Sequence, residues 1–449
     1  MSKQRIQLSD HFTYFRLLRF VLPCIGTTLF TSIYGIVDGL CVSNFVGKTA
    51  FAAVNLIMPL PMLLGTIGFM LGTGGSAIVG ITLGEGDQKK ADRYFTLFLL
   101  AALVSVSVLA VLGIVFLRPI AVLLGAKGEL LDYAVRYGRI LMVSLPTFAL
   151  QNMFQSFFVT AEKPHLGFWF TVGAGCTNMV LDVLMVGIWG WGVEGAAIAT
   201  FISQLVGGVL PVFYFIDRSN SSRLHLCKTS FYSKVLRDAC INGSSELMTN
   251  LSMSLVNILY NYQLLRLAGE NGVAAYGVIM YAAFLFVAVF VGYAVGSAPI
   301  VSFHYGARNH AEVHNLYRKS LRLIAVVAVT LTLASMFIIP CVARIFVGYD
   351  AELLALTSRA FRLYALSFLI MGFNVYASSF FTALGDGVTS ALISFLRTLA
   401  FQVIAILLLP LLLGIDGIWL AVTAAELAAL AVSAAMLLTK DKVFHYRKV

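Results

Sequence analysis

The chain of 449 residues is dominated by apolar runs that are each long enough to cross a lipid bilayer. A membrane-spanning helix needs about 20 consecutive, mostly apolar residues, and short polar or glycine-rich joints separate the runs. Only 12% of the residues are charged, whereas soluble domains carry about 25%. We therefore predict an all-α polytopic membrane protein with 12 transmembrane helices, near residues 16–41, 50–80, 93–117, 133–158, 166–189, 193–216, 238–265, 272–304, 319–343, 357–381, 389–413 and 417–438.

The long polar stretch 217–237 divides these spans into two groups of six, and the two groups resemble each other. Segments match at one shift of 222 residues: 47–53 on 269–275, 152–161 on 374–383, 192–195 on 414–417, and Gly84 on Gly306. Because each group holds an even number of spans, the copies are parallel, with a pseudo-twofold axis along the membrane normal. We predict an N-terminal lobe (1–216), a cytoplasmic linker (217–237) and a C-terminal lobe (238–449). Two such pseudo-symmetric lobes imply a central cavity and alternating access.

The basic residues are distributed unevenly between the two sides of the predicted membrane. Most of the 31 lysines and arginines fall in joints on the side of the N-terminus. Cytoplasmic loops carry an excess of these residues, so we expect both termini in the cytoplasm. The same rule accounts for the net charge of +10 without a nucleic-acid partner. The six cysteines show no metal-ligand spacing and are typical of small buried hydrophobic residues.

Few ionisable residues lie inside the predicted spans, and Asp38 is the one within the first span's apolar core. A charged residue at mid-span costs roughly 2.5–3.5 kcal/mol on insertion scales, so such residues usually face a polar interior. Asn178 and Asp182 in the fifth span share a helix face because they are four residues apart. If that face meets Asp38, the three side chains form a small cage for a proton or Na⁺. The alternative is that the two acids are hydrogen-bonded separately and only position helices.

The two halves differ in the residues that could couple an ion to movement. Pro23 in the first span removes a backbone donor and is a candidate hinge. At the repeat shift, Asp38 falls on Tyr260, and the seventh span contains no proline. We therefore expect ion coupling in the N-terminal lobe. Arg397 and Glu426 also lie within spans and could pair with each other.

Polar, aromatic and methionine side chains in the spans are candidates for a substrate site. Aromatic rings and thioethers suit lipophilic cations, through cation–π contacts and adaptable packing. The alternative, for most of them, is ordinary packing in the core or against lipid. Glu246 near the start of the seventh span is either a substrate counter-ion or an acid favoured by the helix dipole. The predicted substrate site consists of Tyr34, Asn152, Met153, Glu246, Asn257 and Met280.

Several sequence motifs resemble the multidrug and toxic compound extrusion (MATE) family of transporters. They are Gly74-Gly-Ser followed by Leu83-Gly-Glu-Gly-Asp87, its echo Gly296-Ser-Ala-Pro with Tyr305-Gly-Ala, and Ala161-Glu-Lys-Pro164. Together with two halves of six spans, the resemblance covers nearly the whole chain. It is nearest to the bacterial members with an acid in the first helix.

The resemblance implies a multi-pass efflux transporter of the bacterial cytoplasmic (inner) membrane. It would export lipophilic, often cationic drugs as a monomer, without a cofactor, by antiport with H⁺ or Na⁺. The family's cation site consists of a first-helix Asp, an Asn-x-x-x-Asp motif, a tyrosine and a threonine. These fall on Asp38, Asn178, Asp182, Tyr137 and Thr200, with Na⁺ expected at Asp38, Asn178 and Asp182. The tenth span, where some members place a coupling acid, has none between 364 and 381.

Two other functions, a lipid flippase and an intramembrane enzyme, make different demands on the sequence. A lipid-linked precursor flippase of the same superfamily would need basic residues in the cavity for a pyrophosphate, and the candidate positions include few. An intramembrane enzyme would need clustered carboxylates for Mg²⁺ or a histidine-based centre. The seven histidines are scattered and mostly near loops, so we do not expect an enzyme.

Overall fold

The computed structural model describes residues 6–348 and 350–447, and this part of the chain folds into helices without strands. The first half contains α1 (Tyr14–Phe45), α2 (Lys48–Ile57), α3 (Pro59–Gly84), α4 (Gln88–Leu123), α5 (Glu129–Thr160), α6 (Pro164–Leu181), the π-helix η1 (Asp182–Ile188), α7 (Gly192–Gly208) and α8 (Leu210–Ile216). The second half contains α9 (Ser233–Gly306), α10 (His310–Val347), α11 (Ala351–Ala365), α12 (Phe368–Ala383), α13 (Gly387–Phe395), the π-helix η2 (Leu396–Ala400), α14 (Phe401–Leu413), α15 (Ile415–Thr439) and α16 (Asp441–Phe444).

The helices agree closely with the predicted spans, although two neighbouring spans merge into one element. Within the described residues, nine helices are long and apolar enough to cross a membrane, or ten if the bent pair α11 and α12 is one span. α9 contains the seventh and eighth predicted spans, divided at Gly269, where the backbone turns to φ 62° and ψ −150°. Its mate Gly47 also has a positive φ, of 108°. The fold class is confirmed, and the number of twelve spans stays a prediction.

The sequence repeat is visible in how equivalent helices begin. Asp87 caps α4 by accepting a hydrogen bond from the Lys90 amide at 3.0 Å. Asn309, 222 residues later, caps α10 by accepting one from the Glu312 amide at 3.1 Å. Asp and Asn are favoured at this position because their side-chain oxygens satisfy amides that have no partner within the helix. The same local chemistry therefore starts the third span of each half.

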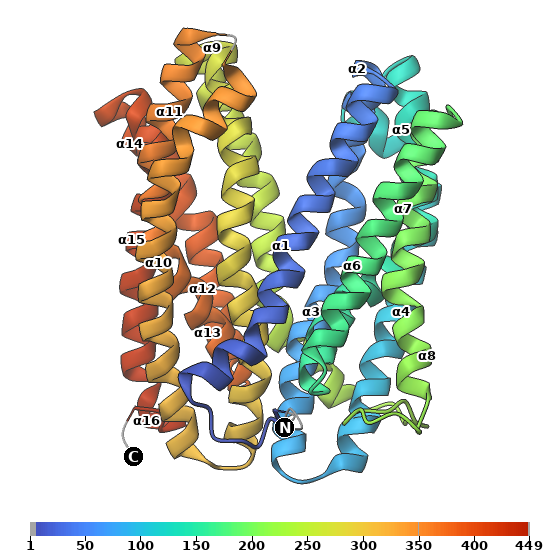
Figure 1. Cartoon of the computed structure of the whole chain (residues 1–449), viewed down its shortest axis with the longest axis vertical. Coiled ribbons are helices and arrows are strands. Elements are labelled where there is room, and N and C mark those ends of the chain that lie inside the picture. Colours follow the sequence, from blue (N-terminus) through green and yellow to red (C-terminus); the bar gives the residue numbers. More distant parts are fainter. Residues whose placement is uncertain (1–5, 349, 448–449) are drawn as a thin grey trace.

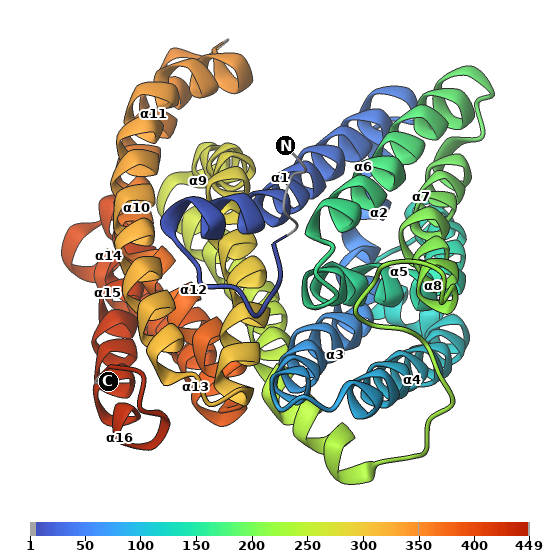
Figure 2. The same ribbon diagram turned by 60° about the horizontal axis from the view of Figure 1, so that its bottom comes forward.

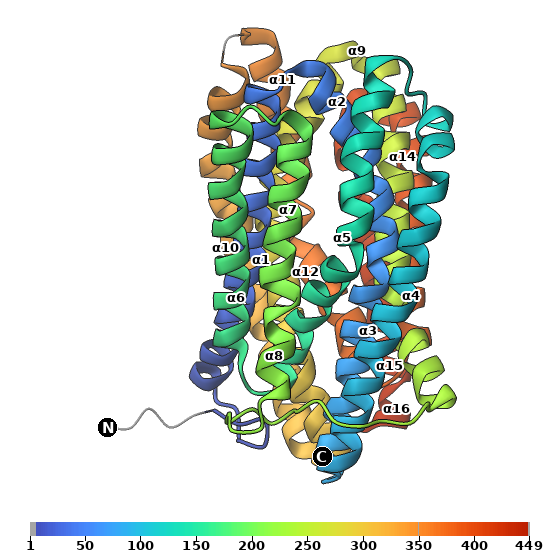
Figure 3. The same cartoon turned by 90° about the vertical axis from the view of Figure 1, so that its right-hand side faces the viewer.

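The two halves form two lobes whose helices run roughly parallel between the ends of the molecule (Figures 1 and 3). Helices α1 to α8 make one lobe and α9 to α16 the other, and both termini lie at the same end, hereafter the terminal end (Figures 1 and 2). Toward the opposite end the ribbons of the lobes diverge (Figure 1). The two-lobed architecture expected from the repeat is confirmed.

Close helix packing joins the lobes at the terminal end, and it follows the pseudo-twofold symmetry. A Cβ atom at Gly84 of α3 would overlap the carbonyl oxygen of Phe303 in α9. Reciprocally, a Cβ at Gly306 would overlap the carbonyl oxygen of Ile81. Because Ile81 and Phe303, like Gly84 and Gly306, are 222 residues apart, this is one contact made twice across the axis. Small residues allow membrane helices to approach this closely.

Further inter-lobe contacts lie elsewhere along α3 and α9 and on α1. Gly243 of α9 packs on the backbone of Met70, and Gly292 packs on Ile25, where a Cβ would lie 2.5 Å from the Ile25 Cα. Thr28 donates a hydrogen bond to the Ala288 carbonyl at 2.7 Å. These contacts place the first half of α1 in the interface between the lobes. Asp38 lies about three turns further along α1, beyond these contacts.

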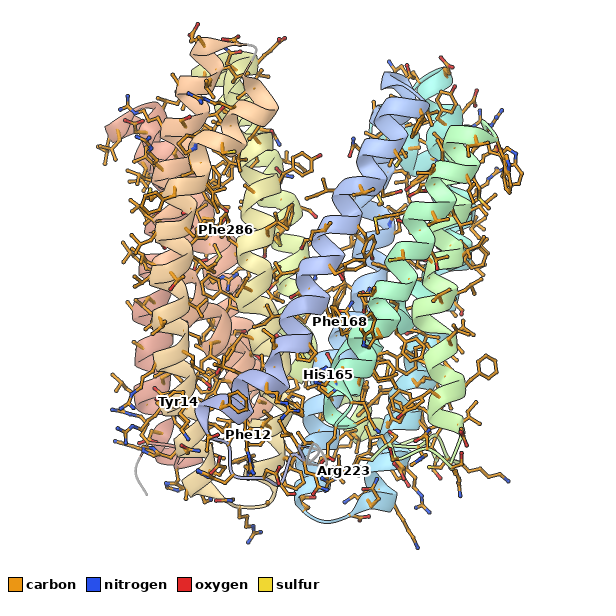
Figure 4. All side chains as sticks on the ribbon, in the orientation of Figure 1. Phe12, Tyr14, His165, Phe168, Arg223 and Phe286 are labelled. Carbon is orange, nitrogen blue, oxygen red and sulfur yellow. The ribbon has the colours of Figure 1, made fainter. Side chains whose placement is uncertain are left out.

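The segment before α1 fastens the two lobes together at the terminal end. On the first lobe, the Leu8 amide donates to Glu162 at 2.9 Å, and Arg223 donates to the same carboxylate at 2.6 Å. On the second lobe, the Phe12 amide donates to Glu312 at 2.8 Å. Figure 4 shows Phe12 and Arg223 together at this end. Hydrogen bonds to charged groups are worth about 1.5–3 kcal/mol each, so the segment helps to keep this end closed.

We predict that Gly84→Ala destabilises the protein. The new methyl group would meet the α9 backbone, and overpacking of this kind costs about 1–3 kcal/mol. Gly277→Ala is the matched control, because nothing lies within 4 Å of a Cβ at Gly277 and alanine is favoured in helices by about 1 kcal/mol. Thermal unfolding of the purified proteins measures the difference. A Gly84→Ala protein at least as stable as the control would contradict the tight interface.

Candidate functional site

The acid of the first span and the polar pair of the fifth span meet inside the first lobe. α1 and α6 pack closely, because Gly175 leaves room for the rings of Phe30 and Tyr34; a Cβ there would lie 2.5 Å from the Phe30 ring. About one turn beyond Tyr34 and two turns beyond Gly175, the Asp38 and Asp182 carboxyl groups lie within hydrogen-bonding reach of each other. Asp182 is fully buried, and Asp38 is 8% exposed.

Three further polar side chains lie in the same part of the lobe. Asn178 of α6 is 2% exposed, and its Nδ2 donates a long hydrogen bond of 3.5 Å to the Thr200 hydroxyl of α7. The Tyr137 side chain of α5 is fully buried and feels the charges of both acids. The structure therefore gathers Asp38, Asn178, Asp182, Tyr137 and Thr200, from five separate elements, in one lobe.

Oxygen atoms of this group lack the donors that buried oxygens normally have. Four oxygens have no N–H or O–H group of the described residues as a hydrogen-bond partner. They are Asp38 Oδ1, both Asp182 carboxyl oxygens and the Tyr137 hydroxyl. Buried polar atoms without partners are rare, and each calls for an explanation such as an ion or a proton. Two carboxylates cannot lie this close unless a proton or a cation stands between them. The group can thus hold one positive charge.

The donor set fits a hard cation as well as a proton. Carboxyl, amide, hydroxyl and phenol oxygens are the ligands that hard cations prefer. A bound Na⁺ would therefore be held by Asp38 and Asp182, with the Asn178 amide beside them. H⁺ and Na⁺ can compete for the same two carboxyl groups because either one removes the repulsion between them.

Asp182 is positioned by a π-helix, and this π-helix was not predicted from the sequence. Asp182 is the first residue of η1, where the backbone bonds reach one residue further than in an α-helix; the Trp189 amide, for example, donates to the Leu184 carbonyl at 2.8 Å. π-bulges inside α-helices are often found at functional sites. The second lobe has a π-helix in its corresponding span, η2, and it carries Arg397. No residue pattern in either segment distinguishes it from an α-helix.

A second polar layer lies beside Tyr34, and sequence reasoning missed it. Gln151 of α5 is 5% exposed and hydrogen-bonded to Tyr34, and its side chain packs on Gly207 of α7. Gln204, one turn earlier in α7, is 8% exposed, and its Oε1 has no partner in the part of the chain described. The available signal was a glutamine in the middle of each of two apolar spans.

The predicted substrate residues do not form one group in this conformation. Asn152 and Met153 are buried in α5, and Met153 belongs to the hydrophobic core, which favours a packing role for it. Glu246, Asn257 and Met280 all lie in α9, in the other lobe. Asn257 is exposed and accepts a hydrogen bond from Asn261 at 2.9 Å, whereas Glu246 and Met280 are half-buried.

Pro23, the candidate hinge, lies within the continuous helix α1. Its carbonyl oxygen accepts a hydrogen bond from the Thr27 hydroxyl at 2.9 Å. The neighbouring turns, from Ile25 to Thr28, pack against α9 of the other lobe. The proline thus lies where α1 touches the second lobe, about four turns before Asp38.

The chain matches a known family twice. The family model of MatE aligns with residues 23–184 and again with residues 247–408. The chain belongs to the MatE family. This confirms the resemblance seen in the motifs and identifies a MATE family transporter rather than an enzyme. A MatE protein with this many apolar helices is a multi-pass membrane protein.

Relatives and solved structures agree with the family over nearly the full length. Multidrug export protein MepA of Staphylococcus saprophyticus is 21% identical over 433 residues, which cover 95% of this chain and 94% of that protein. A crystal structure of MATE in complex with MaL6 has a TM-score of 0.93 and 22% identity, covering 99% of this chain and 100% of that one. A multidrug resistance MATE family transporter in an outward-facing conformation has a TM-score of 0.92 and 22% identity, covering 99% of both chains. At these identities the structures show a shared fold.

We predict that Na⁺ or acidification stabilises this MatE protein, and that Asp38→Asn removes the effect. A cation that binds only the folded state stabilises it by about 2.7 kcal/mol at a hundredfold excess over its Kd. An amide at position 38 can donate to Asp182 and takes the place of the cation. The unfolding temperature is measured against pH and Na⁺ concentration.

Glu194→Gln is the control variant, because that exposed carboxylate pairs with Arg136 at the opposite end of the lobe from the termini. It should respond to the cation like the unmodified protein. The same response in Asp38→Asn would show that the cation acts elsewhere.

Proposed function

We propose that this protein is a secondary-active multidrug efflux transporter, which exports lipophilic, often cationic compounds by antiport with H⁺ or Na⁺. The observation that carries the proposal is the contact between the Asp38 and Asp182 carboxyl groups inside an apolar lobe. Acids buried in a membrane are costly and are typical of ion pathways. Relatives named as multidrug export proteins support the choice of cargo.

The charge state of the acid pair would determine which conformation is favoured. Without a cation, repulsion and burial disfavour the packing of α1 against α6 around the pair. Binding of H⁺ or Na⁺ removes one negative charge and stabilises that packing. Because Pro23 lies in the part of α1 that contacts α9, a shift of α1 at Asp38 can bend the helix at the proline. This would change the cavity wall of the first lobe and release the substrate.

The orientation of the cycle follows from the terminal end. The positive-inside distribution supports a cytoplasmic position for both termini, so the end fastened by Glu162 and Glu312 would face the cytoplasm. The described conformation would then be closed to the cytoplasm. Its likeness to a structure described as outward-facing supports this assignment. Return to the inward-facing state requires the inter-lobe contacts and the bonds of residues 8–12 to open.

The test uses purified protein in liposomes with a fluorescent lipophilic cation, driven separately by a pH gradient and by a Na⁺ gradient. We expect transport under at least one gradient. Transport should be lost in Asp38→Asn, because a neutral amide neither binds nor releases the coupling ion. Glu352→Gln, a change at an exposed position in the first turn of α11, should transport normally. Transport that survives in folded Asp38→Asn, or fails under both gradients in the unmodified protein, would contradict the proposal.

A further inference from the structure

A second cluster of buried charges lies in the C-terminal lobe, away from the acid pair. Arg397 of η2 approaches Glu426 of α15, with 3.3 Å between Arg397 Nε and Glu426 Oε1. The Glu426 side chain is fully buried, and the Arg397 side chain is 15% exposed. The pairing that the sequence suggested is therefore present.

Glu426 is held in place by neutral partners rather than by the arginine. The Asn374 amide donates to Glu426 Oε2 at 2.7 Å and to the Glu426 carbonyl at 2.9 Å. Ser433 in turn donates to Asn374 Oδ1 at 2.8 Å. The carboxylate is thus fixed, and it attracts the guanidinium as a stationary charge.

The contact of Arg397 with Glu426 is incomplete. In the described part of the chain, Arg397 Nε and Glu426 Oε1 are close but not aligned as a hydrogen bond. Arg–carboxylate pairs of full strength are commonly bidentate, with two parallel hydrogen bonds. The guanidinium is therefore attracted by Glu426 without being locked to it.

Glu246 is a second acidic neighbour of the same guanidinium. η2 packs against both α9, which carries Glu246, and α15, which carries Glu426. The positive charge of Arg397 acts on both carboxyl groups. When both acids are ionised, two carboxylates and one guanidinium leave a net charge of −1, so the cluster can then accept one further positive charge.

We propose that Arg397 is a specificity-determining residue, which Glu426 holds away from Glu246 so that Glu246 can receive one positive charge of the substrate. The inference rests on the proposed function, since it takes Glu246 as the counter-ion of a cationic substrate. Arg397 is then a tethered competitor of that substrate. When Glu426 holds the guanidinium, the lobe presents an uncompensated carboxylate to monocationic compounds. When that hold is lost, the guanidinium pairs with Glu246 and occupies the position of the substrate cation.

The test measures equilibrium binding of ethidium, a fluorescent lipophilic monocation, to purified protein in lipid nanodiscs. Glu426→Gln frees Arg397 to pair with Glu246. If the guanidinium then occupies Glu246 about nine-tenths of the time, the apparent Kd rises about tenfold. Arg397→Gln removes the competitor and should bind ethidium at least as tightly as the unmodified protein. The double variant Glu426→Gln/Arg397→Gln should regain the original affinity.

The asymmetry between the variants separates competition from a merely structural pair. If Arg397 and Glu426 only held the helices together, both single variants would weaken binding alike. Equal losses in the two single variants, or a folded double variant that fails to regain affinity, would overturn the inference and leave the proposed function intact. Thermal unfolding verifies that each protein is folded, and the double variant avoids leaving a buried charge unpaired.

Glu246→Gln tests the assumption beneath the inference. It should weaken ethidium binding strongly, because the counter-ion is lost. Unchanged binding in this variant would overturn both the role of Glu246 in substrate binding and the inference about Arg397. That result would not contradict the proposal of antiport through Asp38, because transport under the pH and Na⁺ gradients tests that proposal separately.

Discussion

Repulsion between two carboxyl groups in an apolar surrounding is the constraint on which the N-terminal lobe depends. Asp38 and Asp182 come from different helices, and they can stay together only while a proton or a cation compensates one charge. α1, which carries Asp38, packs through the small residue Gly175 against α6, which leads directly into Asp182 of η1. The same α1 reaches the other lobe through Ile25 and Thr28. A change of charge at one end of this helix can thus be transmitted to the interface between the lobes.

The two lobes share a scaffold but differ in their buried charges. The repeat reproduces helix caps, a π-helix in the fifth span of each lobe and the reciprocal contact of Gly84 and Gly306. The first lobe contains a pair of acids, and the second contains a guanidinium beside Glu426. A symmetric scaffold permits two similar bodies to rock against each other. The asymmetric charges would let one body respond to an ion and the other to a substrate.

Much of the fold could be predicted from the sequence because the bilayer allows few solutions. Apolar runs of sufficient length must be helices, since every backbone polar group must be satisfied without water. Because these runs must be helical, the four-residue spacing of Asn178 and Asp182 predicted that both lie on one helix face. The merging of two spans in α9, the π-helices, and the polar layer of Gln151 and Gln204 were not predicted. These features depend on packing between helices, which leaves no periodic signal in the chain.

The sequence by itself determined the helical class, the two repeated halves and the identity of the membrane-buried acids, because hydropathy and internal repetition are properties of the chain alone. Only the tertiary structure decided that Asp38 faces Asp182, that Arg397 lies beside Glu426, and that the lobes close at the terminal end. Each of these depends on the rotation and depth of one helix relative to another. Small residues such as Gly84 and Gly175 set that relation through contacts between segments far apart in sequence.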